Sequence, residues 1–359
     1  MRRRSNLVGL LLLSLERTAG FFKLCTFNVH EGGHGLEEMF SKFFVPWCEV
    51  AVVNEANGWR LKKTSVIAAR HGFKVEILQT PFGYDIGVLA KKDVVTMERG
   101  SLTTSGSHDG FHHGLLHVVL KSPDQKVHLF GTHLTPHSAL RRREEARQII
   151  GLVRSLEVSE DASVVVAGDM NTLSPLDDHD KSLLETLQSN PRLQAKFLVT
   201  PDSDSTIDYV PMKILLADLV DVAYSHNDKP HFTVPTLLHA DKLHAAPMRL
   251  DYVLFNAKAA ATLLDPQGRA LHVSTLVDDY THRASDHYPL VVDLAKPNFL
   301  ALTTPQRHAA NNHNRHRQQH LDSGPMTTSS KQKKKMRARG VLGLFITSSS
   351  STAASFLIL

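Results

Sequence analysis

Short apolar runs, rich in Val, Leu and Ile and of the length of β-strands, recur along this chain. Residues 163–167 (Ser-Val-Val-Val-Ala) form a β-branched run that predicts a buried strand. Alternation of period two predicts a second strand at 21–30. Similar runs predict further strands at 50–55, 73–78, 84–90, 94–100, 115–121, 126–134, 248–255 and 290–294.

The segments between these strands show a helical pattern of apolar residues instead. Ile149, Leu152, Val153 and Leu156 recur at the i, i+3, i+4, i+7 spacing of one helical face, and Ser138 is a suitable N-cap for that helix. Helices are also predicted at 36–44, 60–71 and 207–222, and in part of 173–206. Strands that alternate with amphipathic helices predict a layered α/β fold. No internal repeat is present, so we expect one domain.

Several predicted strands end in polar side chains. Gly168-Asp169-Met170-Asn171 follows the run 163–167, and if the chain stays extended there, Asp169 and Asn171 point the same way. Such a pair can orient a water and hold a phosphate oxygen. An isolated match of this kind is more often a turn, because Gly, Asp and Asn are all turn formers. Asn28, Glu55 and His133 stand at corresponding ends of other strands. Read alone, Asn28 also fits a strand-end turn residue and Glu55 a solvated surface residue.

Two more acidic positions lie in or beside strands. Asp251 is expected inside the strand 248–255, where a carboxylate needs a partner. Asp286 and His287 directly precede the strand 290–294, and a neighbouring Asp and His can supply a metal ligand and a proton donor. The loop at 225–247 is long for a compact domain, which favours a functional role for it.

Charge is distributed unevenly. The 359 residues carry a formal net charge of +5, but the stretch 296–359 holds ten Lys and Arg against one acid. Residues 1–21 hold four Arg and one Glu, which leaves 22–295 at −7. An acidic body argues against a basic face across the whole domain, as dedicated nucleic-acid binders have. It suits carboxylates gathered around a divalent cation.

Cysteine and histidine usage restricts other chemistries. Cys25 and Cys48 are too few for a disulfide framework or a Cys-rich zinc site. Four histidines cluster in 106–117, and they allow a zinc site or a plain loop that leads into the strand 115–121. No Cys stands in this stretch, and Asp109 is its single acid, which favours the loop. The four are His108, His112, His113 and His117.

The two ends differ from the body. Residues 1–21 combine a basic start with a short apolar run, which fits a secretory signal, an organelle presequence or an uncleaved extension. Residues 296–359 are expected to be a basic, mostly disordered tail that could itself bind nucleic acid or an anionic membrane. The apolar stretch 341–359 is interrupted by four serines, so it is a poor membrane span. Localisation stays open.

Taken together, the strand-end residues form an ordered series that resembles the endonuclease/exonuclease/phosphatase superfamily. This superfamily includes deoxyribonuclease I, abasic-site endonucleases, neutral sphingomyelinases, inositol polyphosphate 5-phosphatases and deadenylases. Gly-Asp-x-Asn and Ser-Asp-His are its most specific marks, and the resemblance covers about 22–295. The matching segments are Phe27-Asn28, Asn54-Glu55, Thr132-His133-Leu134, Gly168–Asn171, Arg249–Tyr252 and Ser285–Pro289.

The resemblance implies a four-layered α/β sandwich, in which two mixed sheets pack face to face with helices outside, and a catalytic domain over 22–295. It also implies metal-dependent hydrolysis of phosphodiesters, with Mg²⁺ or else Mn²⁺ held by Glu55, Asp286 and Asn28. Asp169 would orient or deprotonate the attacking water, and His133 would protonate or stabilise the leaving oxygen. The phosphate would be bound by Asn171 and His287, the latter supported by Asp251.

The chain departs from the superfamily at two points. Asn54 replaces the usual Gln before the metal-binding Glu, and Cys25 and Cys48 do not match the disulfide of the secreted deoxyribonucleases. We therefore expect a nuclease acting on DNA or RNA, but not deoxyribonuclease I itself. A sphingomyelinase-like or inositol-phosphate hydrolase is the alternative, and the apolar loop 232–238 or the tail would then contact membrane. No obligate protein partner is implied.

Overall fold

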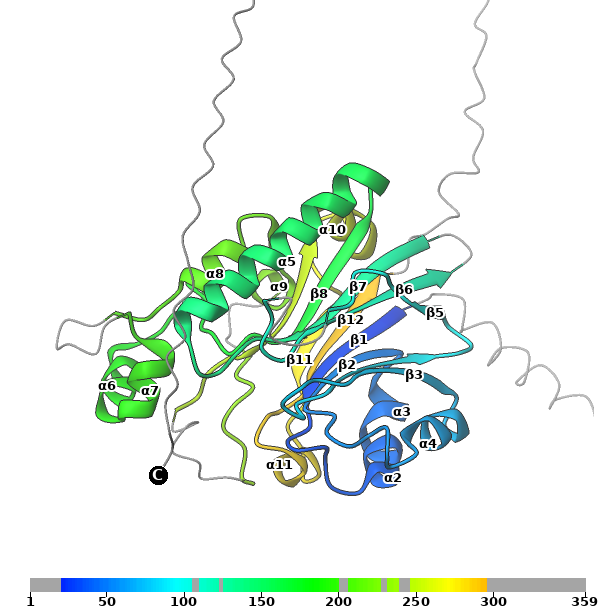
Figure 1. The fold of residues 1–359 in the computed structure, drawn as a ribbon, viewed down its shortest axis with the longest axis horizontal. Helices are drawn as coiled ribbons and strands as arrows, with labels where there is room; N and C mark the ends of the chain where they lie inside the picture. The colour runs from blue at the N-terminus through cyan, green and yellow to red at the C-terminus, as the bar shows by residue number, and fades with distance from the viewer. Residues whose placement is uncertain are drawn as a thin grey trace, which may run out of the picture. The chain divides into compact units, whose positions relative to one another are not determined.

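The computed structural model describes residues 21–104, 110–122, 125–199, 206–226, 231–238 and 246–295. In these residues, two mixed sheets of six strands each lie face to face (Figure 1). The predicted presequence at 1–21, except for Phe21, and the predicted tail at 296–359 lie outside the described residues.

The first sheet has the order β11-β12-β1-β2-β4-β3. β1 pairs with β2 in parallel, so Asn28 lies beside Asn54 where both strands end, and the other pairs are antiparallel. Its strands are β1 (Phe21–Asn28), β2 (Val50–Asn54), β3 (Phe73–Leu78), β4 (Ile86–Lys91), β11 (His272–Thr275) and β12 (Leu290–Ala295).

The second sheet has the order β5-β6-β7-β8-β10-β9. β7 and β8 run parallel and bring His133 beside Asp169, while antiparallel β10 places Asp251 on the other side of Asp169. Its strands are β5 (Thr96–Arg99), β6 (Leu115–Ser122), β7 (Gln125–His133), β8 (Ser163–Asp169), β9 (Leu219–Asp221) and β10 (Asp251–Asn256).

Three apolar clusters hold the layers together. The inner faces of both sheets form one cluster, which includes Val52 and Val165. A second covers the outer face of the first sheet beneath α2 (Leu36–Met39), η2 (Phe40–Phe44), α3 (Val45–Trp47) and α4 (Thr64–Arg70). A third lies beneath α5 (Ala139–Glu160) and α8 (Val210–Leu215), outside the second sheet (Figure 1). The predicted four-layered sandwich is confirmed.

Shorter helices fill the connections. α6 (Lys181–Ser189) and α7 (Pro191–Phe197) lie together beyond one end of the sheets and bury a fourth apolar cluster (Figure 1). Ser138 caps α5 as predicted, because its hydroxyl accepts a hydrogen bond from the Arg141 N–H. The others are α9 (Val222–His226), α10 (Ala257–Leu263) and α11 (Thr281–Ala284).

Several predicted elements were wrong in extent or type. The helix expected at 207–222 is broken: α8 ends at Leu215, a further helix begins only at Val222, and Leu219–Asp221 between them extend to pair with β10. Edge pairing here outweighs the apolar helical pattern. The helix expected at 60–71 begins only at Thr64, after Lys63 in the left-handed region at φ 54°. Asp251 is the first residue of its strand, not an interior one.

The two cysteines are paired, which the composition did not predict. Cys25 in β1 and Cys48, two residues before β2, form a disulfide with Cα atoms 5.8 Å apart. This bond joins the parallel strands at the end away from Asn28 and Asn54. Among the described residues, no helix is long and apolar enough to cross a membrane.

Candidate active site

The alternation of side chains along five strands directs polar groups into the space between the sheets. Val165 and Ala167 point inward from β8, so Asp169, two residues on, does the same at the strand end. Leu24 sets the same phase for Asn28 in β1. The two sheets meet there, because the Asn28 Nδ2 donates to Asp169 Oδ2 at 3.1 Å.

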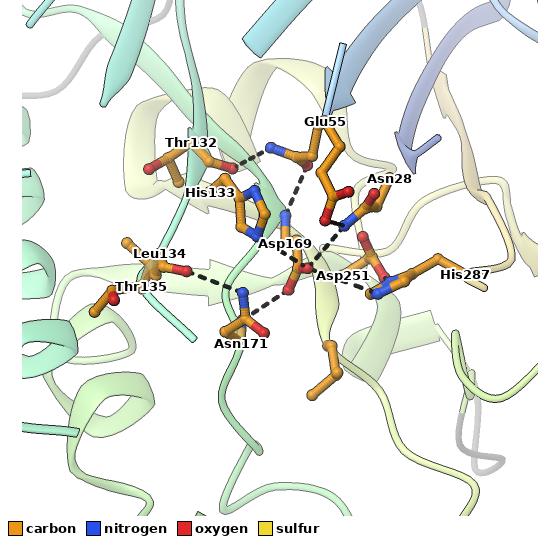
Figure 2. Close-up of polar contacts among 12 residues, drawn as sticks. Asn28, Glu55, Thr132, His133, Leu134, Thr135, Asp169, Asn171, Asp251 and His287 are labelled. Atoms are coloured by element: carbon orange, nitrogen blue, oxygen red, sulfur yellow. Dashed lines mark hydrogen bonds and ion pairs between the residues drawn. The ribbon is translucent and has the colours of Figure 1, made fainter. Parts of the chain in front are cut away.

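The carboxylate of Asp169 is held from several directions (Figure 2). The Asp169 backbone N–H donates to Asn54 Oδ1 at 2.9 Å, and Asn54 Nδ2 donates to the Thr132 carbonyl at 2.7 Å. The Asn171 N–H donates to Asp169 Oδ1 at 2.8 Å. Asn54, which replaces the superfamily's Gln, therefore fastens the first sheet to Asp169 through the backbone.

Glycine at 168 is required by the close packing of β7 against β8. Its φ is +140°, and a Cβ added there would lie 1.9 Å from the Thr132 carbonyl oxygen. No larger residue fits without moving a strand. The glycine of the Gly-Asp-x-Asn segment thus lets Asp169 reach its position.

Glu55 shares Asn28 with Asp169. Its Oε1 accepts from Asn28 Nδ2 at 3.1 Å and its Oε2 accepts from the Glu31 N–H at 3.0 Å (Figure 2). Burial raises the pKa of Glu55, and these two hydrogen bonds oppose the shift. Its φ of 56° lies in the left-handed region, a strained conformation that non-glycine residues adopt mostly where function requires it.

Asp286 reaches the same space from the loop before β12. Its Oδ1 lies 3.4 Å from His30 Nδ1, and the neighbouring Ser285 hydroxyl donates to the Asn28 carbonyl at 2.6 Å. The loop 231–238 holds this segment, since the Thr236 hydroxyl donates to the Ser285 carbonyl at 2.5 Å. The described part of the long loop therefore helps to position Ser285 and the neighbouring Asp286.

His287 and Asp251 form a buried pair. His287 Nδ1 lies 2.7 Å from Asp251 Oδ2 (Figure 2). Burial lowers the pKa of His287, but the carboxylates of Asp251 and Asp169 outweigh it and raise that pKa to about 10. Burial raises the pKa of Asp251, and the facing imidazolium opposes this. The arrangement favours a charged ring at neutral pH.

His133 has the opposite character. It is also buried, and burial together with the charge of His287 lowers its pKa to about 3. His133 Nε2 lies 3.5 Å from Asp169 Oδ2, and His287 Nε2 lies 3.7 Å from the same oxygen. A neutral and a charged imidazole thus approach one carboxylate oxygen, and such divergent environments are typical of acid–base sites.

Asn171 is placed by a turn, so the expectation of an extended chain was wrong. Its φ is 47°, and its Nδ2 donates to the Leu134 carbonyl at 2.9 Å. This bond uses one amide proton and leaves the other available. Asn171 still lines the same cavity as Asp169.

A cavity of about 520 Å³ collects these groups. Seven of the eight predicted site residues line it, and Asp251 lies behind His287. The seven are Asn28, Glu55, His133, Asp169, Asn171, Asp286 and His287. Sequence reasoning missed further lining residues, among them His30, Tyr84, His113, His137, Arg192 and Lys196.

The clustered histidines separate in space. His113 lines the cavity with its ring 4.3 Å from that of His133, whereas His117 bonds to His128 at 3.1 Å on the outer face of the second sheet. His108 lies outside the described residues. Among the described residues, no group of three or more His, Cys, Asp or Glu side chains is arranged to hold a metal ion.

Arg141–Arg143 were expected to be solvated or to touch an anionic substrate. Arg142 is instead buried: it donates to the Thr135 carbonyl at 3.0 Å and also bonds to the Lys196 carbonyl. Arg143 pairs with Asp208 at 3.0 Å. These contacts fasten α7 to the start of α5, which apolar periodicity in α5 does not reveal.

A family model described as the Endonuclease/Exonuclease/phosphatase family matches residues 25–287. The chain belongs to this family. Its members hydrolyse phosphoric esters, so the resemblance drawn from the strand-end residues and the prediction of an enzyme are confirmed. No curated protein matches the chain.

Solved structures share the fold at low identity. An AP endonuclease from Leishmania major is 17% identical, with a TM-score of 0.56 over 83% of this chain and 92% of that one. A 3′-5′ exonuclease from Neisseria meningitidis is 15% identical (TM-score 0.53, 76% and 100% covered). The 2′,3′-cyclic phosphatase ANGEL2 is 14% identical (TM-score 0.51, 76% and 95% covered). At such identities these matches establish the fold alone.

Proposed function

We propose that this chain is a Mg²⁺-dependent phosphodiester hydrolase that acts on nucleic acid. One observation carries the chemistry: Asp169 Oδ2 lies 3.5 Å from His133 Nε2 and 3.7 Å from His287 Nε2. Burial lowers the pKa of His133 to about 3; it also lowers the pKa of His287, but the carboxylates of Asp251 and Asp169 outweigh it and raise that pKa to about 10. A carboxylate beside a neutral and a charged imidazole can orient the attacking water, while the two rings contact the phosphate and the leaving oxygen.

Each residue then has a definite task. Asp169 orients the attacking water and accepts its proton, so the water oxygen bonds to phosphorus as the bond to the leaving oxygen breaks. The imidazolium of His287 and the second amide proton of Asn171 stabilise the negative charge on the phosphate. His133, neutral at pH 7, is better suited to donate a hydrogen bond to the leaving oxygen than to protonate it.

The donor set fits a hard divalent cation. Glu55 and Asp286 bring two carboxylates to one cavity, with the amide oxygen of Asn28 close by. Mg²⁺ uses one or two carboxylates together with water and substrate phosphate. When bound, it supplies charge neutralisation on the phosphate. Glu55 is half-buried and strained, and its pKa is raised by desolvation, so it is the side chain that such a cation would stabilise most.

Planar side chains at the cavity edge support nucleic acid as the substrate. The ring of Phe82, 52% exposed, stacks on His112 at 4.5 Å, and His112 meets the cavity-lining His137 edge-on at 5.7 Å. Bases stack on such surfaces without sequence preference. Two of the fold's solved neighbours are named as an AP endonuclease and a 3′-5′ exonuclease, which agrees with this choice.

A substrate panel with Mg²⁺ tests the proposal. Plasmid DNA, single-stranded DNA, RNA, sphingomyelin, an inositol polyphosphate and bis(p-nitrophenyl) phosphate are offered to the full chain and to Asp169→Asn. We expect hydrolysis of a nucleic acid and of the chromogenic diester, both abolished in the variant. Hydrolysis of sphingomyelin or the inositol phosphate without any nucleic acid would overturn the substrate assignment.

A further inference from the structure

Lys196 is a buried ammonium in the cavity that the catalytic scheme does not use. It is 8% exposed and lines the cavity from α7. Its Nζ lies 5.0 Å from the centre of the Phe197 ring, and among the described residues no carboxylate lies within ion-pair distance of it. A desolvated charge that makes no direct ion pair is costly, so a site that keeps one is a candidate for anion binding.

Arg192 extends the same positive charge. It stands four residues before Lys196 on α7, lines the same cavity and is exposed. Residues four apart lie on one helix face, about 6 Å apart at their Cβ atoms. In the described residues its guanidinium makes no ion pair. Two unpaired cations therefore form a line that leads from the cavity towards solvent.

The helix that carries them is fixed in place. Arg142, buried in α5, bonds to the Lys196 carbonyl and to the Thr135 carbonyl two residues beyond β7. Asp208 donates its N–H to the Phe197 carbonyl at 2.7 Å and is itself held by Arg143 at 3.0 Å. The position of Lys196 is thus set by the core rather than by a surface loop, as a preorganised binding group requires.

The two cations share the cavity with the strand-end groups but make no direct hydrogen bond or ion pair with them in the described residues. Asp169, Asn171 and His287 come from the ends of the sheets and bond to one another and their neighbours, whereas no hydrogen bond joins them to Lys196 or Arg192. Burial lowers the pKa of Lys196 to about 8, and the charge of Asp169 opposes this, so the ammonium persists at neutral pH. The cavity has room for more than one anionic group.

We propose that Lys196 and Arg192 form a second anion subsite, which binds a phosphate of the substrate other than the one hydrolysed. This inference rests on the proposed phosphodiesterase function and narrows its substrates to those with a second phosphate close to the scissile one. A nucleic-acid chain and a polyol phosphodiester that carries a further phosphate share that chemistry, and small bisphosphates serve as binding probes for the two sources.

Kinetics on matched dinucleotides test the subsite in the full chain. Thymidylyl-thymidine is compared with the same molecule carrying a 5′- or a 3′-phosphate, and the ratio of kcat/KM values is the readout. We expect the wild type to prefer one phosphorylated form by about tenfold, the usual worth of a charged hydrogen bond. Lys196→Met should remove this preference, Lys196→Arg should retain it, and Arg192→Gln should reduce it.

The controls separate the subsite from folding and from catalysis. Met nearly matches Lys in volume, and loss of an unpaired buried charge is not expected to unfold the chain, which a thermal melt checks. Lys213→Met, an exposed lysine of α8, should leave the ratio unchanged. Equal losses on phosphorylated and unphosphorylated substrates in Lys196→Met, or no preference in the wild type, would overturn the subsite.

Ligand binding measured by calorimetry tests the anion subsite independently of hydrolysis. Thymidine 3′,5′-bisphosphate and inositol 1,4-bisphosphate are titrated against thymidine 5′-monophosphate and inositol 1-phosphate. Tighter binding of either bisphosphate, lost in Lys196→Met, supports the subsite even if no diester is hydrolysed, and the tighter one identifies the source. Equal binding of bisphosphates and monophosphates would count against it, whether or not bis(p-nitrophenyl) phosphate is hydrolysed.

Discussion

The Asp251 carboxylate lies 2.7 Å from His287 Nδ1, and both side chains are buried. Asp251 is the first residue of β10 in the second sheet, and His287 lies in the loop before β12 of the first sheet. A residue of the second sheet therefore orients the imidazole ring of a residue next to the first sheet. This pair supports the first prediction.

Asp251→Asn should lower kcat about 100-fold or more, because the imidazolium of His287 loses its buried counter-ion. The raised pKa of His287 keeps the ring charged up to about pH 10. Without Asp251 that pKa falls, so the basic limb of the pH–rate profile should move to lower pH. The measurement is a pH series on bis(p-nitrophenyl) phosphate.

A double-mutant cycle provides the control for this pair. His287→Ala should cost at least as much as Asp251→Asn, and the double variant should lose little more, since the two residues act as a unit. If the losses add, Asp251 serves another partner and the pairing has no catalytic role.

Glu55→Gln tests the metal assignment. The substitution keeps the shape and removes the charge, so turnover should fall about 100-fold or more while the fold survives. The stability should not fall, because burial already disfavours the charged form of Glu55. Glu144→Gln, on the exposed side of α5, is the matched control. Full activity of the Glu55 variant in chelator-treated buffer would refute the assignment.

Glu145 predicts a pH dependence of stability. This buried carboxyl accepts from the backbone N–H groups of His112 and Thr135, yet burial raises its pKa to about 7. The folded state therefore binds a proton more tightly than the unfolded state, whose pKa is near 4.5. Stability from this group is present at low pH and is lost as pH rises from about 4.5 through 7, by roughly 3 kcal/mol.

The measurement for Glu145 is a difference. Denaturant melts of wild type and Glu145→Gln between pH 4.5 and 8 cancel the other titrating groups, so the free-energy gap should move in favour of the variant as pH rises. A constant gap for Glu145→Gln over this pH range would mean that burial does not raise its pKa.

Two glycine substitutions should have opposite signs. Gly168→Ala places a Cβ 1.9 Å from the Thr132 carbonyl oxygen at a φ of +140°, so it should destabilise the chain by about 2 kcal/mol or more. Gly151→Ala, in the middle of α5 with nothing within 4 Å, should stabilise it by about 0.5–1 kcal/mol. Thermal melts of both variants check this contrast.

The strand-end residues could be predicted from sequence because two simple periods place them. Alternation fixes the face of Asn28 and Asp169, and the apolar runs fix where each strand stops. Once strands end at one edge, their polar side chains must meet. The fold class followed from the same alternation between strands and helices.

What escaped prediction depends on contacts distant in sequence. Lys196 has no local signal, because a lysine on a seven-residue helix resembles any solvated lysine until Arg142 fastens that helix to the site. The apolar pattern around β9 predicts a helix, and these residues form a strand because the edge of β10 is available for pairing. The disulfide between Cys25 and Cys48 depends on the parallel pairing of β1 with β2, which two cysteines alone do not indicate.

The hydrogen bond from Asn28 to Asp169 joins a residue of the first sheet to one of the second. Each sheet alone carries only part of the proposed catalytic set, so we expect a chain with correct secondary structure but loosened layers to be inactive. The activity of a sample therefore reports the fraction of molecules whose two sheets are correctly packed. Activity should be lost before helical and strand content during mild denaturation, which makes catalysis a sensitive reporter of packing in this chain.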